Sequence, residues 1–287
     1  MPMRALAEFI MAGRLRAGLV ALLGNFLPLV SPAAVALVVL RRGLSEGCLV
    51  LLWAVLPLII LLSSGNMNGA MVWASVFSVL VALLGASVLT RTRAWTSTLK
   101  VILGLSMASG LVMKLWLAAD VSTMREALNE MLRQLQQQNS ALVFEPSELF
   151  VAGLLGWVIA LTSASALILA RWWQSLLYNP GGFSTEFHAL RFDKLSASLL
   201  FAALMGCYLL GQEYVAWGNL LGLPLLLSGV ALVHHSVAFA GLGRRWLVVF
   251  YMGLVFLLGP LSSVLIGLGF LDSVMDFRSR LAARRSL

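Results

Sequence analysis

The sequence predicts an all-α protein, a polytopic transmembrane helical bundle of about 8–10 membrane segments with amphipathic helices at its surface. Of its 287 residues, 60% are hydrophobic and only 11% are charged, whereas a soluble domain carries about 25% charged residues. Apolar runs approaching the about 20 residues of a membrane helix recur along the chain. Alternating segments typical of a β-barrel are not found in the sequence. We therefore treat residues 1–287 as a single transmembrane domain.

The first apolar run is interrupted by prolines. Residues 1–27 begin as an amphipathic piece and become apolar, and Pro28 and Pro32 then break the run. Because proline lacks the amide donor that a helix interior needs, residues 31–40 are predicted to form a separate short helix, closed by Arg41 and Arg42. Interrupted helices often line binding sites in membrane proteins.

Four further apolar runs are predicted to cross the membrane before residue 171. They are residues 49–62, 70–90, 99–119 and 149–170. Ser147 is the predicted N-cap of the last of these. Ser106 with Gly110 in one run, and Ala152 with Gly156 in another, form small-residue pairs that allow helices to approach closely.

Residues 120–147 form a polar interruption that we expect on the outer side of the membrane as an amphipathic segment. Its carboxylates outnumber its basic residues, and loops without a basic excess face outward by the positive-inside rule. Thr123 and Glu126 match a capping box, so a surface helix is expected to start there.

Residues 171–194 form a second polar interruption, predicted to be a cytoplasmic elbow on the inner membrane surface. It opens with a tryptophan pair, which suits the boundary between lipid and water, and a proline followed by two glycines then stops the helix. The elbow is either a plain interfacial connector or a docking surface for a partner protein. In the second reading its docking residues are Phe183, Phe187, Arg191 and Lys194.

Three apolar runs follow the elbow, at residues 195–210, 217–240 and 246–270. The last contains Gly259 and Pro260, which allow a bent or re-entrant path. Such a path keeps the arginine-rich tail, with Arg284 and Arg285 near its end, on the cytoplasmic side. We therefore expect both termini in the cytoplasm.

The net charge of +8 does not point to nucleic acid. Its basic residues stand in pairs beside the ends of apolar runs, which is the pattern that orients membrane spans. The lipid bilayer is the partner that this pattern indicates. Other membrane or cytoplasmic proteins are the partners expected if the elbow is a docking surface.

Few residues in the apolar runs carry polar chemistry. The candidates for a small-molecule ligand are Arg14, Asn25, Lys114 and Asn219; for the two cations, extension of the side chain to the lipid headgroups is the alternative. The adjacent pair His234 and His235 is compatible with interfacial packing, a proton-linked role or, least well, a metal ligand, since neighbouring histidines face different sides of a helix.

Motifs of enzyme chemistry are not found in the sequence. It contains no glycine-rich phosphate loop, nucleophile elbow, thiolate cluster or paired catalytic carboxylates. We therefore predict no catalytic residues, no cofactor and no metal site, and a chain that does not hydrolyse ATP by itself.

Three stretches resemble the YybS-like family of bacterial polytopic membrane proteins. They are FLPLVSPAAVALVVLRRGLSEG (residues 26–47), FSTEFHALRFDK (residues 183–194) and GLGFLDSVMDFRSR (residues 267–280). The proline-bounded short helix and the terminal Gly-x-x-Asp with its downstream Asp-Phe-Arg carry most of the resemblance, which spans nearly the whole chain.

This resemblance implies a location and two alternative functions. The location is the bacterial inner membrane. The family is distantly similar to the substrate-capture subunits of energy-coupling-factor vitamin transporters, which implies binding or transport of a small solute by a subunit that lacks its own ATPase. It is also distantly similar to the rod-shape protein MreD, which implies instead a structural or assembly partner in an inner-membrane envelope complex.

Overall fold

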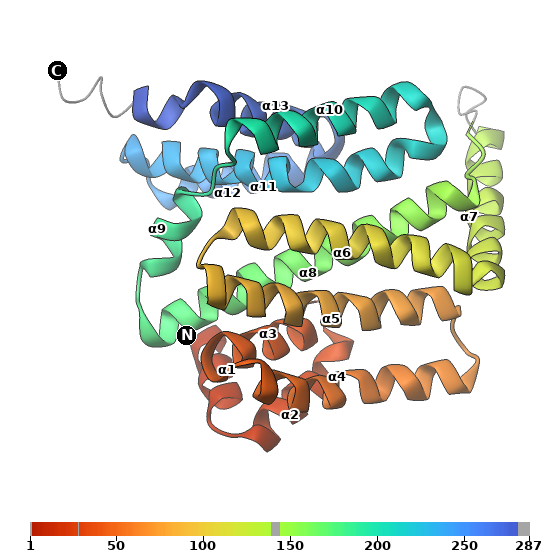
Figure 1. Ribbon diagram of the computed structural model, residues 1–287, viewed down its shortest axis with the longest axis horizontal. Coiled ribbons are helices and arrows are strands. Elements are labelled where there is room, and N and C mark those ends of the chain that lie inside the picture. Colours follow the sequence, from red (N-terminus) through yellow and green to blue (C-terminus); the bar gives the residue numbers. More distant parts are fainter. Residues whose placement is uncertain (1, 28, 139–143, 281–287) are drawn as a thin grey trace. The chain divides into compact units, whose positions relative to one another are not determined.

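The structure, a computed structural model, describes residues 2–27, 29–138 and 144–280. All regular elements in these ranges are helices (Figure 1). In chain order they are α1 (Pro2–Met11), α2 (Arg14–Leu23), η1 (Gly24–Phe26), α3 (Val30–Arg42), α4 (Leu44–Ser64), α5 (Gly69–Thr92), α6 (Trp95–Trp116), α7 (Ala118–Gln138), α8 (Glu148–Tyr178), α9 (Gly182–His188), α10 (Lys194–Leu210), η2 (Gln212–Tyr214), α11 (Val215–Phe239), α12 (Arg244–Phe256) and α13 (Leu258–Met275). Pro28, residues 139–143 of the acidic segment, and Arg284 and Arg285 lie outside the described residues.

The prediction of an all-α polytopic bundle is confirmed. Within the described residues, six helices are long and apolar enough to cross a membrane, and α10 is a shorter apolar helix. The six are α4, α5, α6, α8, the segment Gln212–Phe239 and α13. The N-terminal run is divided into α2 and α3, of 10 and 13 residues, and α12 also has only 13 residues. These pieces are shorter than the about 20 residues of a span.

Internal contacts divide the chain into two compact units. Unit 1 comprises residues 1–180 and 207–220, and unit 2 comprises residues 181–206 and 221–287.

The first apolar run is interrupted between η1 and α3, and α3 lies inside unit 1. After η1, Leu29 takes a left-handed conformation with φ 69° and α3 begins at the next residue. The hydroxyl of Ser31 donates to the backbone oxygen of Ala21 at 2.7 Å, which ties the start of α3 to α2. All residues of α3 from Ser31 to Leu40 are buried. The separate short helix expected from the prolines is therefore present, and its apolar sequence is explained by burial on all sides.

Helices α3, α5, α6 and α8 form the centre of unit 1, with α2 and α4 packed beside them. A Cβ atom at Gly110 would lie 2.5 Å from the backbone oxygen of Ala152, and one at Gly156 would lie 3.0 Å from that of Ser106. The two small-residue pairs singled out in the sequence thus pack against each other and bring α6 and α8 into backbone contact.

Helix α7 lies across one end of the long helices of unit 1 (Figure 1). It begins at Ala118, so the capping box expected at Thr123 is wrong: the Thr123 hydroxyl bonds to the oxygen of Ala119 inside the helix, at 2.9 Å. A tertiary contact sets this start, because Asp120 accepts a hydrogen bond from the backbone nitrogen of Gly69 at the start of α5. The predicted N-cap of α8 is confirmed, since the Ser147 hydroxyl accepts from the amide of Phe150 at 3.1 Å.

The elbow is shorter than its sequence range. Helix α8 continues through the tryptophan pair to Tyr178, so residues 171–178 belong to a membrane-length helix. The proline and glycine residues then end it, and Gly181 takes φ 86°, which glycine adopts without strain. The seven-residue helix α9 follows.

In unit 2 the final apolar run breaks into α12 and α13. The break lies at Leu257, two residues before the expected Gly259, and Pro260 occupies the first turn of α13, where a missing amide costs no hydrogen bond. His234 of α11 bonds to the Tyr251 hydroxyl of α12 at 2.8 Å. Arg278, just after α13, donates to the backbone oxygen of Leu190 at 2.9 Å. The segment that follows α13 therefore lies at the elbow, within unit 2.

Candidate functional site

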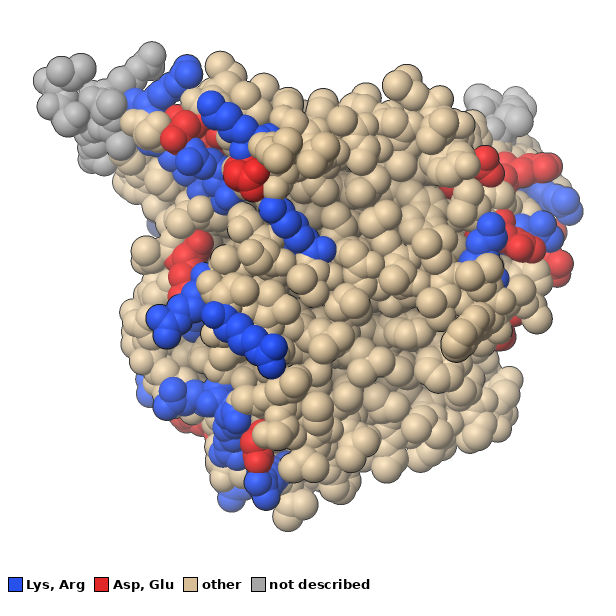
Figure 2. Space-filling view, viewed as in Figure 1, with Lys and Arg blue, Asp and Glu red and all other residues tan. Residues whose placement is uncertain are grey.

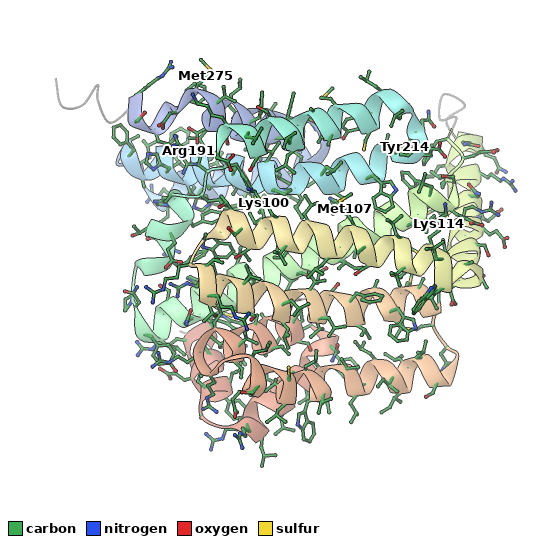
Figure 3. The ribbon with its side chains drawn as sticks, in the orientation of Figure 1. Lys100, Met107, Lys114, Arg191, Tyr214 and Met275 are labelled. Carbon is green, nitrogen blue, oxygen red and sulfur yellow. The ribbon has the colours of Figure 1, made fainter. Side chains whose placement is uncertain are left out.

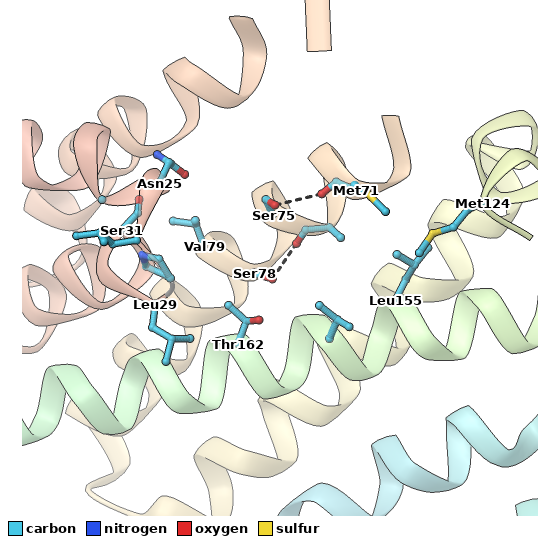
Figure 4. A pocket seen from close by; sticks show the side chains of 15 residues that line it. Asn25, Leu29, Ser31, Met71, Ser75, Ser78, Val79, Met124, Leu155 and Thr162 are labelled. Atoms are coloured by element: carbon cyan, nitrogen blue, oxygen red, sulfur yellow. Dashed lines mark hydrogen bonds between the residues drawn. The ribbon is translucent and has the colours of Figure 1, made fainter. Parts of the chain in front are cut away.

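A cavity of about 340 Å³ lies in unit 1 beside the broken helix (Figure 4). Its lining comes from η1 and the start of α3, from α5, and from α7 and α8. The lining residues are Gly24, Asn25, Leu27, Leu29, Ser31, Pro32, Met71, Ala74, Ser75, Ser78, Val79, Met124, Leu155, Val158 and Thr162. The volume is at the lower end of the range of about 300–1,000 Å³ found for small-molecule sites.

Asn25 is fixed at the edge of this cavity by backbone oxygens. Its side-chain nitrogen Nδ2 lies 3.1, 3.2 and 3.0 Å from the oxygens of Ala21, Leu22 and Ala54. These contacts join the end of α2 to α4. Because the donors of the amide are used in this way, the oxygen Oδ1 is left as an acceptor, and it has no donor among the described residues.

The serine hydroxyls of the lining are used in the same way. Ser31 donates to the oxygen of Ala21. Ser75 donates to the oxygen of Met71 at 3.1 Å, and Ser78 donates to that of Ala74 at 2.8 Å (Figure 4). A hydroxyl that donates its only hydrogen still offers lone pairs. The cavity is therefore apolar for most of its surface, carries no charged side chain among its lining residues, and presents hydrogen-bond acceptors.

The structure does not bring the four predicted ligand residues together. Asn25 lines the cavity, whereas Arg14, Lys114 and Asn219 do not. Arg14 pairs with Glu46, with its nitrogen Nε 2.8 Å from Oε2, and this hydrogen bond and attraction raise the pKa of Arg14. Lys114 lies near the end of α6 (Figure 3), and Asn219 accepts a hydrogen bond from the Tyr208 hydroxyl at 2.8 Å.

Sequence reasoning missed the hydroxyl residues of α5 and α8. Ser75 and Ser78 are three residues apart on α5, which places them on one helix face, and Thr162 projects from α8. The signal was this spacing of hydroxyl residues in an apolar span. Serines that only bond to their own helix show the same spacing, and Ser75 and Ser78 also make such bonds.

The four predicted docking residues lie in unit 2. Phe187 is only 7% exposed; its ring stacks on Phe183, with centroids 5.6 Å apart, and meets His234 edge-on at 5.5 Å. Arg191, labelled in Figure 3, forms an ion pair with Asp276. Lys194 is exposed at the start of α10. Phe187 and Arg191 thus hold the elbow to other parts of unit 2, and docking of a partner stays a prediction.

A buried ion pair fixes the end of α13 beside the elbow. Asp272 is fully buried, and its oxygen Oδ2 lies 3.0 Å from the nitrogen Nε of Arg278. Arg278 also donates to the backbone oxygens of His188 and Leu190. Burial lowers the pKa of Arg278, and the attraction to Asp272 opposes this shift. Asp272 balances the charge of a guanidinium that is largely removed from water, and the two elbow carbonyls accept from its terminal nitrogens.

Six helices of the described residues are long and apolar enough to cross a membrane. The chain therefore belongs to the class of multi-pass α-helical membrane proteins. Comparisons of the chain with protein-family models, with curated proteins and with solved structures found no match.

Proposed function

We propose that the protein is a solute-binding or transport subunit of the bacterial inner membrane that lacks its own ATPase. The observation that carries this proposal is the cavity beside the broken helix in unit 1. Discontinuous helices provide backbone and side-chain polar groups at membrane depth only where these line a cavity or are buried in protein. Here Asn25 and Ser31 flank the break and also line the cavity.

The lining favours a small neutral solute with hydrogen-bond donors. Asn25 supplies a free acceptor oxygen, the serine hydroxyls supply lone pairs, and Met71, Met124 and Leu155 supply apolar surface. An anionic solute would find no charged partner among the lining residues. The lining also lacks carboxylates, imidazoles and thiols, which supports binding rather than catalysis.

Charge asymmetry supports an orientation for unit 1. Basic side chains gather where α3 and α5 end and α6 begins (Figure 2). At the other end of the helices, α7 carries acidic and basic side chains together, with Asp120, Glu126 and Glu130 against Arg125 and Arg133. By the positive-inside rule the first end faces the cytoplasm and α7 faces outward. In this proposal an ATPase, if transport is active, belongs to another chain on the cytoplasmic side.

The decisive experiment is a ligand screen of the purified full chain by thermal shift. Neutral vitamins and nucleobases that carry N–H or O–H donors should stabilise the protein, because a ligand that binds only the folded state raises its stability. The Ser75→Phe variant fills the cavity from an exposed position on α5 and should lose this stabilisation.

Ser63→Phe is the matched control. Ser63 is also an exposed serine that donates to its own helix, at 2.9 Å to the oxygen of Ile60, and it does not line the cavity. A ligand that stabilises the parent and Ser63→Phe but not Ser75→Phe supports the proposal. Equal stabilisation of all three, or a screen in which no neutral solute stabilises the parent, contradicts it.

Assembly with other envelope proteins is the second candidate, and one observation favours it. On the polar helix α7, Met131 and Leu135 stand one helical turn apart, and they are 59% and 40% exposed. Such a stripe suits docking on a protein. Envelope proteins recovered in stoichiometric amount from gentle detergent, together with an empty ligand screen, would select this function over solute binding.

A further inference from the structure

Unit 2 contains a hollow of about 490 Å³ that the proposed function does not use. It lies where the elbow meets the end of α11 and the segment after α13. Its lining residues are Thr185, His188, Ala189, Arg191, His235, Asp276 and Arg278. Figure 2 shows basic and acidic side chains gathered around α9 and the end of α13.

The hollow is lined mainly by groups that donate hydrogen bonds. Two guanidinium groups, two imidazole rings and the Thr185 hydroxyl face it, against the single carboxylate of Asp276. That carboxylate is already held, because it pairs with Arg191 and accepts from the backbone nitrogen of Ser279 at 3.3 Å. It is also 42% exposed, so its charge is partly screened by solvent.

Several of these donors retain capacity. Arg278 directs three of its nitrogens at Asp272 and at two backbone oxygens, which leaves further N–H groups of its five. The nitrogen Nε2 of His235 is buried and has no hydrogen-bond partner among the described residues. The Thr185 hydroxyl likewise has no hydrogen-bond partner among the residues that the structure describes.

We propose that this hollow binds a phosphate group. Arginine pairs bind phosphate oxygens through paired N–H donors, and hydroxyl and imidazole groups complete such sites. A cation would meet only one carboxylate, which Arg191 already neutralises. The phosphate belongs either to an anionic lipid headgroup or to a free phosphate ion; the two share the same chemistry at the hollow.

The guanidinium of Arg278 is held in place by a buried carboxylate. Asp272 is fully buried behind Arg278 and orients it, since Asp272 also accepts from the backbone nitrogen of Phe277 at 3.1 Å. The guanidinium is therefore fixed before a ligand arrives. A preorganised donor set loses less conformational freedom on binding than a flexible one.

The test compares two neighbouring hydroxyl residues. Thr185→Glu puts a carboxylate into the hollow, where it competes for the same donors and repels an anion. Ser184→Glu adds the same charge one residue away, at an exposed serine that bonds to the oxygen of Gly181 and does not line the hollow. Neither hydroxyl takes part in the contacts that hold Arg278.

The probe is inorganic phosphate added to the purified full chain, with chloride at equal ionic strength as reference. We expect phosphate to raise the thermal midpoint of the parent and of Ser184→Glu. Thr185→Glu should bind phosphate at least about tenfold more weakly than the parent. Both variants should unfold at similar temperatures in chloride. No phosphate response in the parent, or an equal response in both variants, would overturn the proposal.

A second arm distinguishes the two sources of phosphate. The chain is reconstituted in vesicles of equimolar phosphatidylcholine and phosphatidylglycerol and re-extracted, and its bound lipid is measured. Phosphatidylglycerol enriched on the parent and on Ser184→Glu but not on Thr185→Glu identifies a lipid headgroup. A phosphate response without such enrichment identifies the free ion.

Discussion

Asn25 joins three features of unit 1 at one residue. It follows α2 in η1, its amide nitrogen reaches the oxygen of Ala54 on α4, and its side chain lines the cavity. Residues flanking a break in a membrane helix must satisfy backbone oxygens that the helix no longer uses. A side chain with two donors and one acceptor performs this function and still presents one polar atom to a ligand.

We expect Asn25→Ala to destabilise the protein by about 0.5–1.5 kcal/mol, because backbone oxygens on α2 and α4 lose a side-chain donor while Ser31 still donates to Ala21. Asn66→Ala removes an exposed asparagine amide in the loop before α5 and serves as the control. Unfolding of both variants in detergent measures the difference. Equal stability of the two would mean that the amide does not hold the break closed.

At the scale of elements, glycines set how closely helices approach in both units. In unit 2, a Cβ atom at Gly269 of α13 would lie 2.2 Å from the backbone oxygen of Leu225, and one at Gly229 of α11 would lie 2.0 Å from that of Leu265. Backbone atoms cannot move aside as a flexible side chain can. In lipid, such close van der Waals contact is a main source of association between helices.

Gly269→Ala should therefore cost about 1–3 kcal/mol, since α11 and α13 must separate to admit the methyl group. Gly267 lies on the same helix and has open space around it. Gly267→Ala should be neutral or stabilising by up to about 1 kcal/mol, because alanine is the better helix former. Thermal unfolding of the two variants checks this, and a destabilised Gly267→Ala beside an unaffected Gly269→Ala would refute the packing argument.

At the scale of the whole molecule, the charge distribution predicts topology. The prediction places α7 outside and the elbow in the cytoplasm. Cys48 and Cys207 are both free thiols, so an accessibility test starts from a chain in which alanine replaces them. Single cysteines are then introduced at Gln137 and Ser184, which are both exposed.

An impermeant maleimide applied to intact cells should label Gln137→Cys directly and Ser184→Cys only after permeabilisation. Thr92→Cys, exposed at the basic end of α5, should behave like Ser184→Cys. Labelling of Gln137→Cys and Ser184→Cys from the same side would reject this topology. Thr92→Cys labelled from outside would reject the orientation of unit 1 alone.

The amino-acid sequence by itself determined the class of the protein and most of its helices. Composition alone excluded a soluble domain, because 11% charged residues cannot cover a globule in water. Local chemistry also sufficed at the Ser147 N-cap and at the short helix after the proline break, since capping and proline act within a few residues.

Only the tertiary structure decided which polar residues share a site. Asn25 and Thr162 line one cavity although they are far apart in sequence, while Arg14, expected with Asn25, turns to Glu46 instead. It also decided that α7 starts before its capping box, because Asp120 bonds to α5. The physical reason is the same in each case: these residues are positioned by contacts between helices, whereas sequence patterns report only what lies within one helix.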